Sequence, residues 1–451
     1  MSAPPKRFRR IKRLVLALAG LLLAGTALAL IVLACMYREA LYHRFILFPR
    51  QAEAWQAIRN QREPVTLDDH WNEFRGVCHS HSEISHDSEI TFPEIAEALR
   101  KAGLHFIFMS DHCVDGKADY GKQWRGVHDG IVFVPGYEMS GGFMPWGLPS
   151  DTVLDASKDP AMLAREIHEK GGLLFFAHPE GERRWDLPEL NGMEIYNLHA
   201  DFADERLGGL FPDIVLSLSA YPDQMLRLIF DRQTDLLKHW DELNTTRKIV
   251  GIAANDCHQN TGFRGFYTPQ DTLLVTSTGD RDAIKEWKLN GLKRGLLRLF
   301  FGPLEPGKQL FRIDLDPYER SARYVNTHLL AKACTEEDLL DAMAQGRVFV
   351  AFDMIAPATG FTYLAEGGGV LAVMGETIPL SPGLVLKAAS PSPCRFAIVH
   401  DGVQVHGCEG RQFEWAVPEP GKYRVEAALD ILGEWVPWVY TNPIDVRPSL
   451  E

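Results

Sequence analysis

The chain has 451 residues, of which 46% are hydrophobic and 24% are charged. This is the composition of a folded protein with an extensive core, and the length exceeds that of one ordinary domain, so two or three structural units are expected. The formal net charge of −13 at pH 7 excludes an extended basic surface of the kind that binds nucleic acid.

The N-terminal segment differs from the rest of the chain. Residues 1–13 contain six Lys and Arg and no acid, and residues 14–37 are uncharged and mostly apolar. This pattern predicts a basic cytoplasmic tail followed by one membrane-spanning helix. The predicted location is therefore the inner membrane, with a single pass, a juxtamembrane stalk over 38–70 and the remainder of the chain periplasmic or extracellular. The alternative is a lipoprotein signal that ends at Cys35.

Between residues 71 and 350, short apolar runs alternate with helical patterns, which favours a parallel sheet that closes, or nearly closes, into a barrel. Helices are predicted from Pro93, Pro160, Gln224 and Arg281. The predicted strands are 73–78, 106–109, 131–134, 173–176, 193–196, 248–253 and 272–276.

Residues 351–451 lose the helical periodicity and are richer in Gly, Pro and Val, which indicates a small all-β sandwich. The segment around Asp401-Gly402 has the residues of a tight hairpin turn. That hairpin would place Cys394 and Cys408 nearly opposite each other, so the two thiols either form a disulfide or stay free.

Metal-ligand residues follow five of the predicted strands. In a parallel barrel, the carboxyl ends of the strands converge on one face, so these side chains are expected to meet in one metal centre. Mixed imidazole and carboxylate ligands suit Zn, Mn or Fe. The candidates are His79, His81, His86, Asp87, His112, Glu138, His178, Asp256 and His258.

The motifs "HSHSEISHD", "SDH", "PGYE", "AHP" and "NDCH" resemble, in order, those of the PHP (polymerase and histidinol phosphatase) superfamily of metal-dependent phosphoesterases. The likeness spans about residues 73–300 and implies a distorted seven-stranded (β/α) TIM-like barrel. By this resemblance, Glu138 bridges two metals, of which His178 binds the second. His79, His81 and Asp256 complete the first site, and His112 and His258, with His86 or Asp87, hold a further metal.

The chain departs from this family pattern at two places. Gly142 stands where the family usually supplies another histidine, so two metals are favoured over three. In the first motif, both His86 and Asp87 are able to ligate, and their spacing does not choose between them. Asp111, beside His112, is expected to accept a hydrogen bond from an imidazole N–H.

Arg183 and Arg264 follow the His178 and His258 motifs, and guanidinium groups suit a phosphate substrate. His199 follows another strand and is a third candidate substrate contact. The predicted function is hydrolysis of a small-molecule or cell-envelope phosphate ester by a metal-activated hydroxide. The alternatives are a hydrolase of amides or other non-phosphorus substrates, and a non-catalytic metal-binding sensor or assembly protein.

Overall fold

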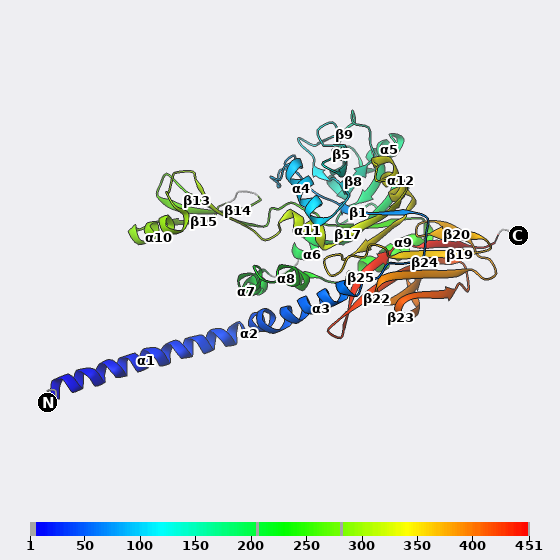
Figure 1. The fold of residues 1–451 in the computed structure, drawn as a ribbon. Coiled ribbons are helices and arrows are strands. Elements are labelled where there is room, and N and C mark those ends of the chain that lie inside the picture. The colour runs from blue at the N-terminus through cyan, green and yellow to red at the C-terminus, as the bar shows by residue number, and fades with distance from the viewer. Residues whose placement is uncertain (1–5, 204–206, 280–282, 450–451) are drawn as a thin grey trace. The chain divides into compact units, whose positions relative to one another are not determined.

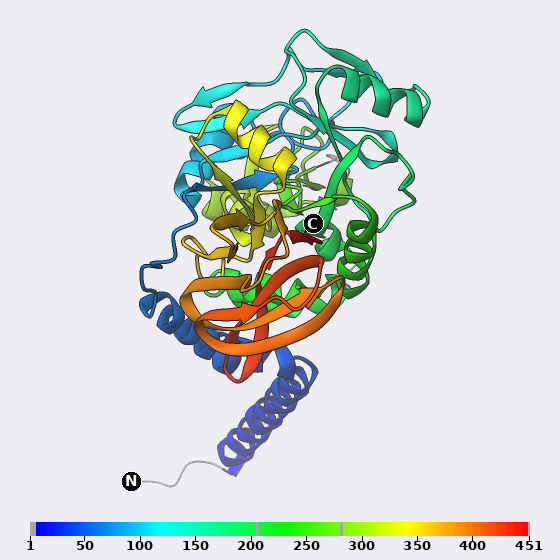
Figure 2. The same cartoon turned by 90° about the vertical axis from the view of Figure 1, so that its right-hand side faces the viewer.

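The structure, a computed structural model, describes residues 6–203, 207–279 and 283–449. The chain divides into two compact units, one made of residues 1–53 and 205–228 and the other of residues 54–204 and 229–451. Figures 1 and 2 show the elements of each unit in two perpendicular views. The two units are described separately below.

The described residues of the first unit form helices joined by turns. It contains α1 (Lys6–Met36), α2 (Arg38–Tyr42), a π-helical turn at His43–Leu47 and the start of α3 (Phe48–Asn60). Its second segment holds α7 (Leu207–Ser217) and α8 (Pro222–Leu226). The Nδ1 atom of His43 lies 2.8 Å from Oδ1 of Asp213, and the Arg44 guanidinium lies over the ring of Tyr221. These contacts join the two segments of the unit.

The predicted membrane-spanning helix over 14–37 requires correction. Among the helices of the described residues, none combines the length and the apolar character needed to cross a membrane. The predictions of a spanning helix and of a single-pass inner-membrane location are therefore wrong. They rested on the apolar run and the basic residues before it, and in the structure both belong to one longer helix, α1, which begins at Lys6. Residues 1–5 of the predicted tail lie outside the described residues.

In the second unit, β1 (Asn72–Cys78) lies within a 14-stranded mixed sheet. It pairs in parallel with β2 (Phe106–Phe108), which pairs in parallel with β6 (Ile131–Val134). On its other side, β1 pairs antiparallel with β17 (Asn326–Ala331), and β17 continues to β18 (Val348–Ala351). The immediate neighbours of β1 are therefore parallel on one side, β2, and antiparallel on the other, β17.

A separate four-stranded sheet carries three more of the predicted barrel strands. Its order is β12-β11-β10-β8. The strands β10 (Leu173–Phe176), β11 (Leu190–Asn197) and β12 (Val250–Ala254) are parallel, and β8 (Phe143–Trp146) is antiparallel to β10. Beyond the ends of β1 and β12, the isolated bridge Ser80↔Cys257 links the two chain segments.

The predicted closed or nearly closed barrel is wrong. In the described part of the chain, β12 forms a ladder only with β11, and the place beside β1 is taken by β17. The strand predicted at 272–276 is present as β14 (Thr272–Ser277), but it belongs to a different, antiparallel sheet. Because a barrel closes only when its last strand pairs with its first, the fold is a mixed α/β arrangement of several open sheets.

The C-terminal strands are mostly antiparallel, as their sequence predicts, with β21 (Thr377–Pro379) and β26 (Ile444–Arg447) as a parallel pair, and they continue the large sheet. β18 pairs with β25 (Glu434–Thr441), which pairs with β24 (Gly421–Ile431). Figure 2 shows the orange and red strands of this part of the chain curving together below the yellow helix α12 (Glu336–Gln345). The other members are β19 (Thr362–Gly367), β20 (Val370–Val373), β22 (Val385–His400) and β23 (Val403–Ala416).

The hairpin between β22 and β23 turns at Asp401-Gly402, and both residues have positive φ, as the sequence indicates. Its register pairs Cys408 with Phe396, and Cys394 with Gly410. The two thiols are thus offset along the strands and both are free. Of the two predicted alternatives, a disulfide or two free thiols, the structure has the free thiols.

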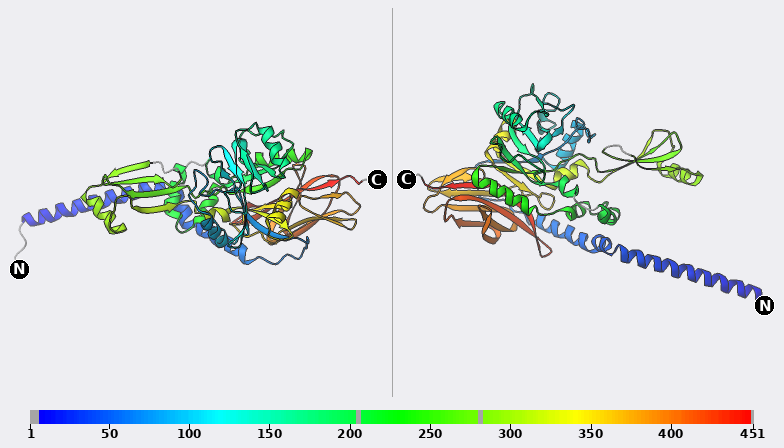
Figure 3. Two further views of the ribbon diagram at one scale, coloured as in Figure 1. Left: turned by 90° about the horizontal axis from the view of Figure 1, so that it is seen from above. Right: turned by 180° about the vertical axis from the view of Figure 1, so that it is seen from behind.

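Residues 262–314 form a four-stranded antiparallel arm, visible in green in Figures 1 and 3. Its strands are β13 (Gly262–Tyr267), β14, β15 (Ala283–Lys288) and β16 (Gln309–Asp314), with helix α10 (Gly291–Phe301) after β15. The helix predicted from Arg281 is therefore wrong, since residues 283–288 are a strand; residues 281 and 282 lie outside the described residues.

Helices flank the core sheets and begin with the caps that their sequences indicate. Thr91 and Glu94 form a capping box at the start of α4 (Phe92–Ala102), and Thr335 caps α12 (Glu336–Gln345). The remaining elements are α5 (Pro160–Glu169), α6 (Leu198–Ala203), the 3₁₀ turns at Ser140–Gly142 and Arg227–Ile229, α9 (Thr234–Thr246), α11 (Tyr318–Tyr324), β3 (Asp111–His112), β4 (Lys117–Asp119), β5 (Gly126–His128), β7 (Tyr137–Glu138) and β9 (Val153–Asp155).

Candidate metal centre

The ends of several strands bring imidazole and carboxylate groups together in the second unit. His79 and His81 follow β1, and His112 and Glu138 pair with each other across the short strands β3 and β7. From the second sheet, His178 follows β10. The predicted convergence of these side chains is therefore present even though the barrel is not closed.

The backbone turns sharply at three of these strand ends. The φ angles of His79, His178 and Asp256 are 61°, 46° and 49°, in the left-handed region that side-chain-bearing residues seldom occupy. Such conformations cost about 1–3 kcal/mol each and are concentrated at functional sites.

The Asp256 carboxylate lies at the middle of the cluster. Its Oδ1 atom is 3.2 Å from Nε2 of His79 and 3.1 Å from Nε2 of His81, and its Oδ2 atom is 3.4 Å from Nε2 of His178. The Glu138 carboxylate lies beside it, with Oε2 at 3.3 Å from Nε2 of His79 and Oε1 at 3.4 Å from Nε2 of His178. Two carboxylates thus share one set of ring nitrogens.

A second group adjoins the first. Oδ2 of Asp87 lies 3.3 Å from Nε2 of His112 and 3.2 Å from Nε2 of His258. The rings of His81 and His258 are stacked, with their centroids 3.9 Å apart. His81, Asp87, His112 and His258 therefore form a group whose ligand atoms are close enough to hold one ion. His86, the alternative to Asp87, is exposed and belongs to no such group among the described residues.

Three histidines have their Nδ1 atoms held by protein acceptors. The Glu194 carboxylate accepts from Nδ1 of His79 at 2.5 Å, and the Asp256 carbonyl accepts from Nδ1 of His258 at 2.8 Å. Nδ1 of His81 donates to Oγ of Ser85 at 3.1 Å, because the Ser85 hydroxyl hydrogen is directed at Asp111. The network therefore assigns the Nδ1 proton and leaves each Nε2 atom facing the carboxylates.

Two buried atoms at the middle of the cluster have no hydrogen bond. They are Nε2 of His81 and Oδ1 of Asp256, which lie 3.1 Å apart. Because the His81 proton is on Nδ1, these two atoms face each other with lone pairs. Buried acceptors in this arrangement are unfavourable unless a cation lies between them. The donor set thus fits a divalent metal ion.

The charges in the cluster are strongly coupled. Burial, together with the nearby His258, lowers the pKa of His81 to about 3, so this ring is neutral. Burial raises the pKa of Glu138, but the charge and hydrogen bond of His79 outweigh it and hold that pKa at about 2. Burial also opposes protonation of His79, yet Asp256, Glu194 and Glu138 raise its pKa well above the usual range.

Glu194 was missed by the sequence analysis. Its side chain is fully buried in β11, where its carboxylate also accepts from the backbone N–H of His178 at 2.9 Å and from Nδ2 of Asn197 at 3.0 Å. Glu194 therefore orients two of the candidate ligands. The available signal was a single acid within the otherwise apolar strand "MEIY".

Asp111 does not contact the His112 ring as predicted. Its carboxylate accepts from the backbone N–H and hydroxyl of Ser82, from the hydroxyl of Ser85 and from Nε2 of Gln123. Asp111 acts instead on His81, because Ser85 connects the two side chains. It also holds the loop that follows β1.

His199 and Arg183 both lie near the cluster. The His199 ring centroid is 5.2 Å from that of His258, and burial lowers the His199 pKa. Nε of Arg183 donates to the carbonyl of Ala177, the residue before His178, at 2.9 Å. A Cβ atom on Gly142 would lie 2.1 Å from Nε of Arg183. The space beside Gly142, where the family resemblance suggests a ligand, is thus occupied by the Arg183 guanidinium.

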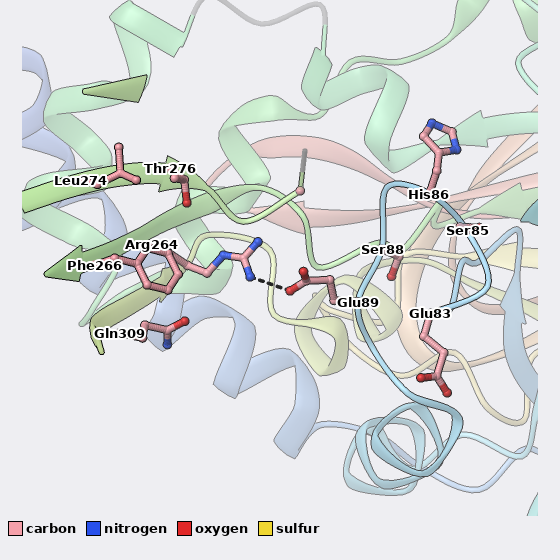
Figure 4. Close-up of a pocket in the computed structure, with 11 residues that line it drawn as sticks. Glu83, Ser85, His86, Ser88, Glu89, Arg264, Phe266, Leu274, Thr276 and Gln309 are labelled. Atoms are coloured by element: carbon pink, nitrogen blue, oxygen red, sulfur yellow. Dashed lines mark hydrogen bonds and ion pairs between the residues drawn. The ribbon is translucent and has the colours of Figure 1, made fainter. Parts of the chain in front are cut away.

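Arg264 lies farther out and is already paired. Its Nη1 atom is 2.6 Å from Oε2 of Glu89, and its Nη2 atom donates to the carbonyl of Thr278 at 2.8 Å. It lines a pocket of about 970 Å³ between the loop after β1 and the arm (Figure 4). Arg264 therefore forms part of the pocket wall, and Glu89 neutralises its charge.

The pocket wall is shared with the metal-type cluster. Ser85, which holds Nδ1 of His81, lines the pocket, and so does His86, whose ring centroid is 4.9 Å from that of His112. Phe266 and Thr276 form part of the opposite wall, on the arm (Figure 4). The Thr276 hydroxyl is buried and has no hydrogen-bond partner. The pocket thus offers an aromatic face and an unused hydroxyl beside the cluster.

Comparisons with known proteins give one distant structural neighbour to report. No protein-family model and no curated protein matches the chain. The fold is similar to the crystal structure of a two-domain protein from Bacteroides vulgatus ATCC 8482, described as containing a predicted PHP-like metal-dependent phosphoesterase. The TM-score is 0.36 and the identity 12%, over 85% of this chain and 98% of the neighbour. No residue of the site is assigned from this likeness.

Proposed function

We propose that the second unit is a metal-dependent hydrolase that cleaves a phosphate ester. The observation that carries the proposal is the common orientation of the histidines. His79, His81 and His258 each have Nδ1 held by a protein acceptor and Nε2 directed at Asp256, Glu138 or Asp87. Metal-binding histidines are held in this way, with an acceptor on the nitrogen that does not bind the ion.

The proposed ligands form two neighbouring sites. His79, His81, Glu138 and Asp256 hold one ion, and His178 extends this site across Glu138. Asp87, His112 and His258 hold the second, next to His81. The mixture of imidazole and carboxylate groups suits Zn, Mn or Fe. Such ions, when bound, activate water and neutralise charge on a phosphoryl oxygen.

The rest of the site supplies orientation and charge. Arg183 is half-buried beside His178 and offers a guanidinium to a phosphoryl group. His199 is kept neutral by burial, so its ring is available to accept or donate a proton near His258. Arg264 is tied to Glu89 and is proposed to shape the pocket rather than to bind phosphate.

The pocket beside the cluster is proposed to receive the organic part of the ester. Glu83 and Glu89 lie on its wall, and Arg264, the guanidinium among the described lining residues, is paired with Glu89, so this part of the lining does not favour a second anionic group. Phe266 offers an aromatic face, and the Thr276 hydroxyl lacks a partner. A neutral organic group with hydroxyls fits this lining.

The test is to count bound metal and then to measure hydrolysis. The purified chain, loaded with Zn, Mn or Fe, is expected to hold two ions per molecule and to hydrolyse 4-nitrophenyl phosphate or bis(4-nitrophenyl) phosphate. The His81→Ala variant should lose both metal and turnover, whereas His406→Ala, in β23, should lose neither.

Two results would contradict the proposal. One is a metal content of one ion or none per chain in the presence of excess metal. The other is full metal loading without turnover of any ester in a panel of phosphomonoesters and phosphodiesters. Turnover of amides alone would instead assign the site to a hydrolase of non-phosphorus substrates.

A further inference from the structure

Helix α10 in the arm exposes an apolar face. Leu292, Leu296, Leu299 and Phe300 have the spacing i, i+4, i+7 and i+8, which places them on one side of a helix. Their exposed fractions are 75%, 46%, 76% and 75%. Folded proteins seldom leave large apolar side chains in such a contiguous group without a partner.

The same helix is held to the arm by its other side. Phe301 lies near Phe311 of β16, with the ring centroids 6.0 Å apart. Between the helix and the sheet is an apolar groove of about 370 Å³, lined by residues that include Leu273, Trp287 and Leu297. The arm therefore supports α10 as a stable platform, and the groove continues the apolar surface.

The segment that contains α10 carries only positive charges. Residues 287–304 contain Lys288, Lys293, Arg294 and Arg298 and no acid, although the whole chain has a net charge of −13. Arg294 pairs with Asp271. Lys293 and Arg298 are exposed. An apolar helix face flanked by basic side chains is the pattern of helices that lie in a lipid interface.

A second copy of the chain is a poorer occupant for this surface. In a symmetric pair, the helix would face its own copy, and the exposed Lys293 and Arg298 of both copies would be brought together. Anionic lipid headgroups supply the missing negative charge, and the acyl region accepts the leucines and Phe300.

We propose that α10 and its groove dock on an anionic lipid surface, with the helix lying in the plane of that surface. This contact is peripheral and involves no spanning helix. It is independent of the metal centre, because α10 contributes no residue to the candidate ligand groups or to the pocket beside them. Docking would hold the arm, one wall of that pocket, against lipid.

The test uses the full chain and local hydrogen–deuterium exchange. Vesicles of phosphatidylglycerol are expected to slow exchange in residues 291–301, whereas vesicles of phosphatidylcholine should leave it unchanged. The double variant Leu299→Glu/Phe300→Glu should lower the partition coefficient at least about tenfold, and Lys293→Glu or Arg298→Glu about fivefold each at low salt.

A matched control separates this surface from any other apolar one. Met162 on α5 is 65% exposed, so Met162→Glu makes the same kind of change elsewhere and should leave partitioning unaltered. Helix α1 is the same in every variant, so its own contribution cancels.

Three results would overturn the proposal. Exchange in 291–301 could be insensitive to vesicles, or neutral and anionic vesicles could protect it equally. Protection that needs no vesicles and rises with protein concentration would assign the surface to a second copy of the chain. As a control for folding, the double variant should hydrolyse phosphate esters at the same rate as the unmodified chain.

Discussion

Strand β1 contributes to two buried clusters of histidine and carboxylate, and they differ in one respect. Near its start, Glu73 and Arg75 meet His328 and Asp353. Beyond its end, His79 and His81 meet Glu138 and Asp256. The first cluster is closed, because each polar atom has a partner. The second is open, because Nε2 of His81 and Oδ1 of Asp256 face each other without a proton between them.

The closed cluster can be followed atom by atom. Nδ1 of His328 lies 2.6 Å from Oε1 of Glu73, and Nε2 lies 3.1 Å from Oδ2 of Asp353, which also accepts from Arg75 at 2.9 Å. The remaining carboxylate oxygens accept from the backbone N–H groups of Ala358 and Gly360. No ion is needed there, so this cluster stabilises the fold, whereas the open cluster is suited to binding.

The sharpest test of the open cluster is Asp256→Asn. Its carboxylate lies 3.1–3.4 Å from ring nitrogens of four histidines, so the change removes a shared ligand. Phosphate ester hydrolysis is expected to fall at least about 10⁴-fold, equivalent to ~5 kcal/mol, while the chain stays folded. Steady-state kinetics and circular dichroism measure the two effects. Asp235→Asn, on the exposed side of α9, is the control, and a fully active Asp256→Asn variant would remove the distinction between the clusters.

The corresponding change in the closed cluster is Asp353→Asn. It removes the carboxylate that Nε2 of the buried His328 shares with the Arg75 guanidinium, so the free energy of unfolding should fall by about 4 kcal/mol. Denaturant unfolding measures this loss. The activity of the molecules that remain folded should be unchanged. A stable but inactive Asp353→Asn variant would show that the closed cluster also serves the chemistry.

The closed cluster also predicts a pH dependence of stability. Burial lowers the pKa of His328, but Asp353 and Glu73 outweigh it and raise that pKa to about 9. The unfolded chain has the ordinary value near 6.5, so the stabilisation is complete below pH 6.5 and is lost as the pH rises through 9. The difference in unfolding free energy between the unmodified chain and His328→Gln should shrink by about 3 kcal/mol over this range. A difference that stays constant with pH would refute the assignment, and His406→Gln is the control.

A smaller effect is expected from Glu194→Gln. The amide still reaches Nδ1 of His79 but no longer carries the charge that fixes its proton. Metal affinity should fall about 10–100-fold, as for other acceptors behind metal-bound histidines. Competition with a chelator measures it. Glu169→Gln, at the exposed end of α5, should show no change; equal affinities for both variants would place Glu194 outside the site.

The local structure was largely readable from the sequence, whereas the pairing of strands was not. All seven predicted strands exist, including β1, β6 and β10, because their apolar runs are short and bounded by turn residues. The barrel was wrong because two neighbours were misplaced: β17, "NTHLLA", was not predicted, and β14 lies in the arm. Which strand lies beside which is set by contacts between distant segments, and these leave no periodic signal in the chain.

In the candidate site, too, features set by the local sequence were predictable and features set by contacts between distant segments were not. Residues directly after strands, such as His79, His178 and Asp256, were predictable, because parallel neighbours point their carboxyl ends to one side. Asp87, rather than the exposed His86, faces His112 and His258, which the spacing alone did not decide. Glu194 escaped notice because its role depends on a partner 115 residues away in the sequence.

The left-handed backbone at His79, His178 and Asp256 makes thermal stability and the proposed metal binding opposing demands on these three positions. Glycine adopts such angles without steric cost, so replacing any of these residues by glycine would relax the main chain while deleting a candidate ligand. Selection for thermal tolerance alone would favour those replacements, and selection for turnover would oppose them. A laboratory population evolved only for heat resistance should therefore lose these three candidate ligands before the others.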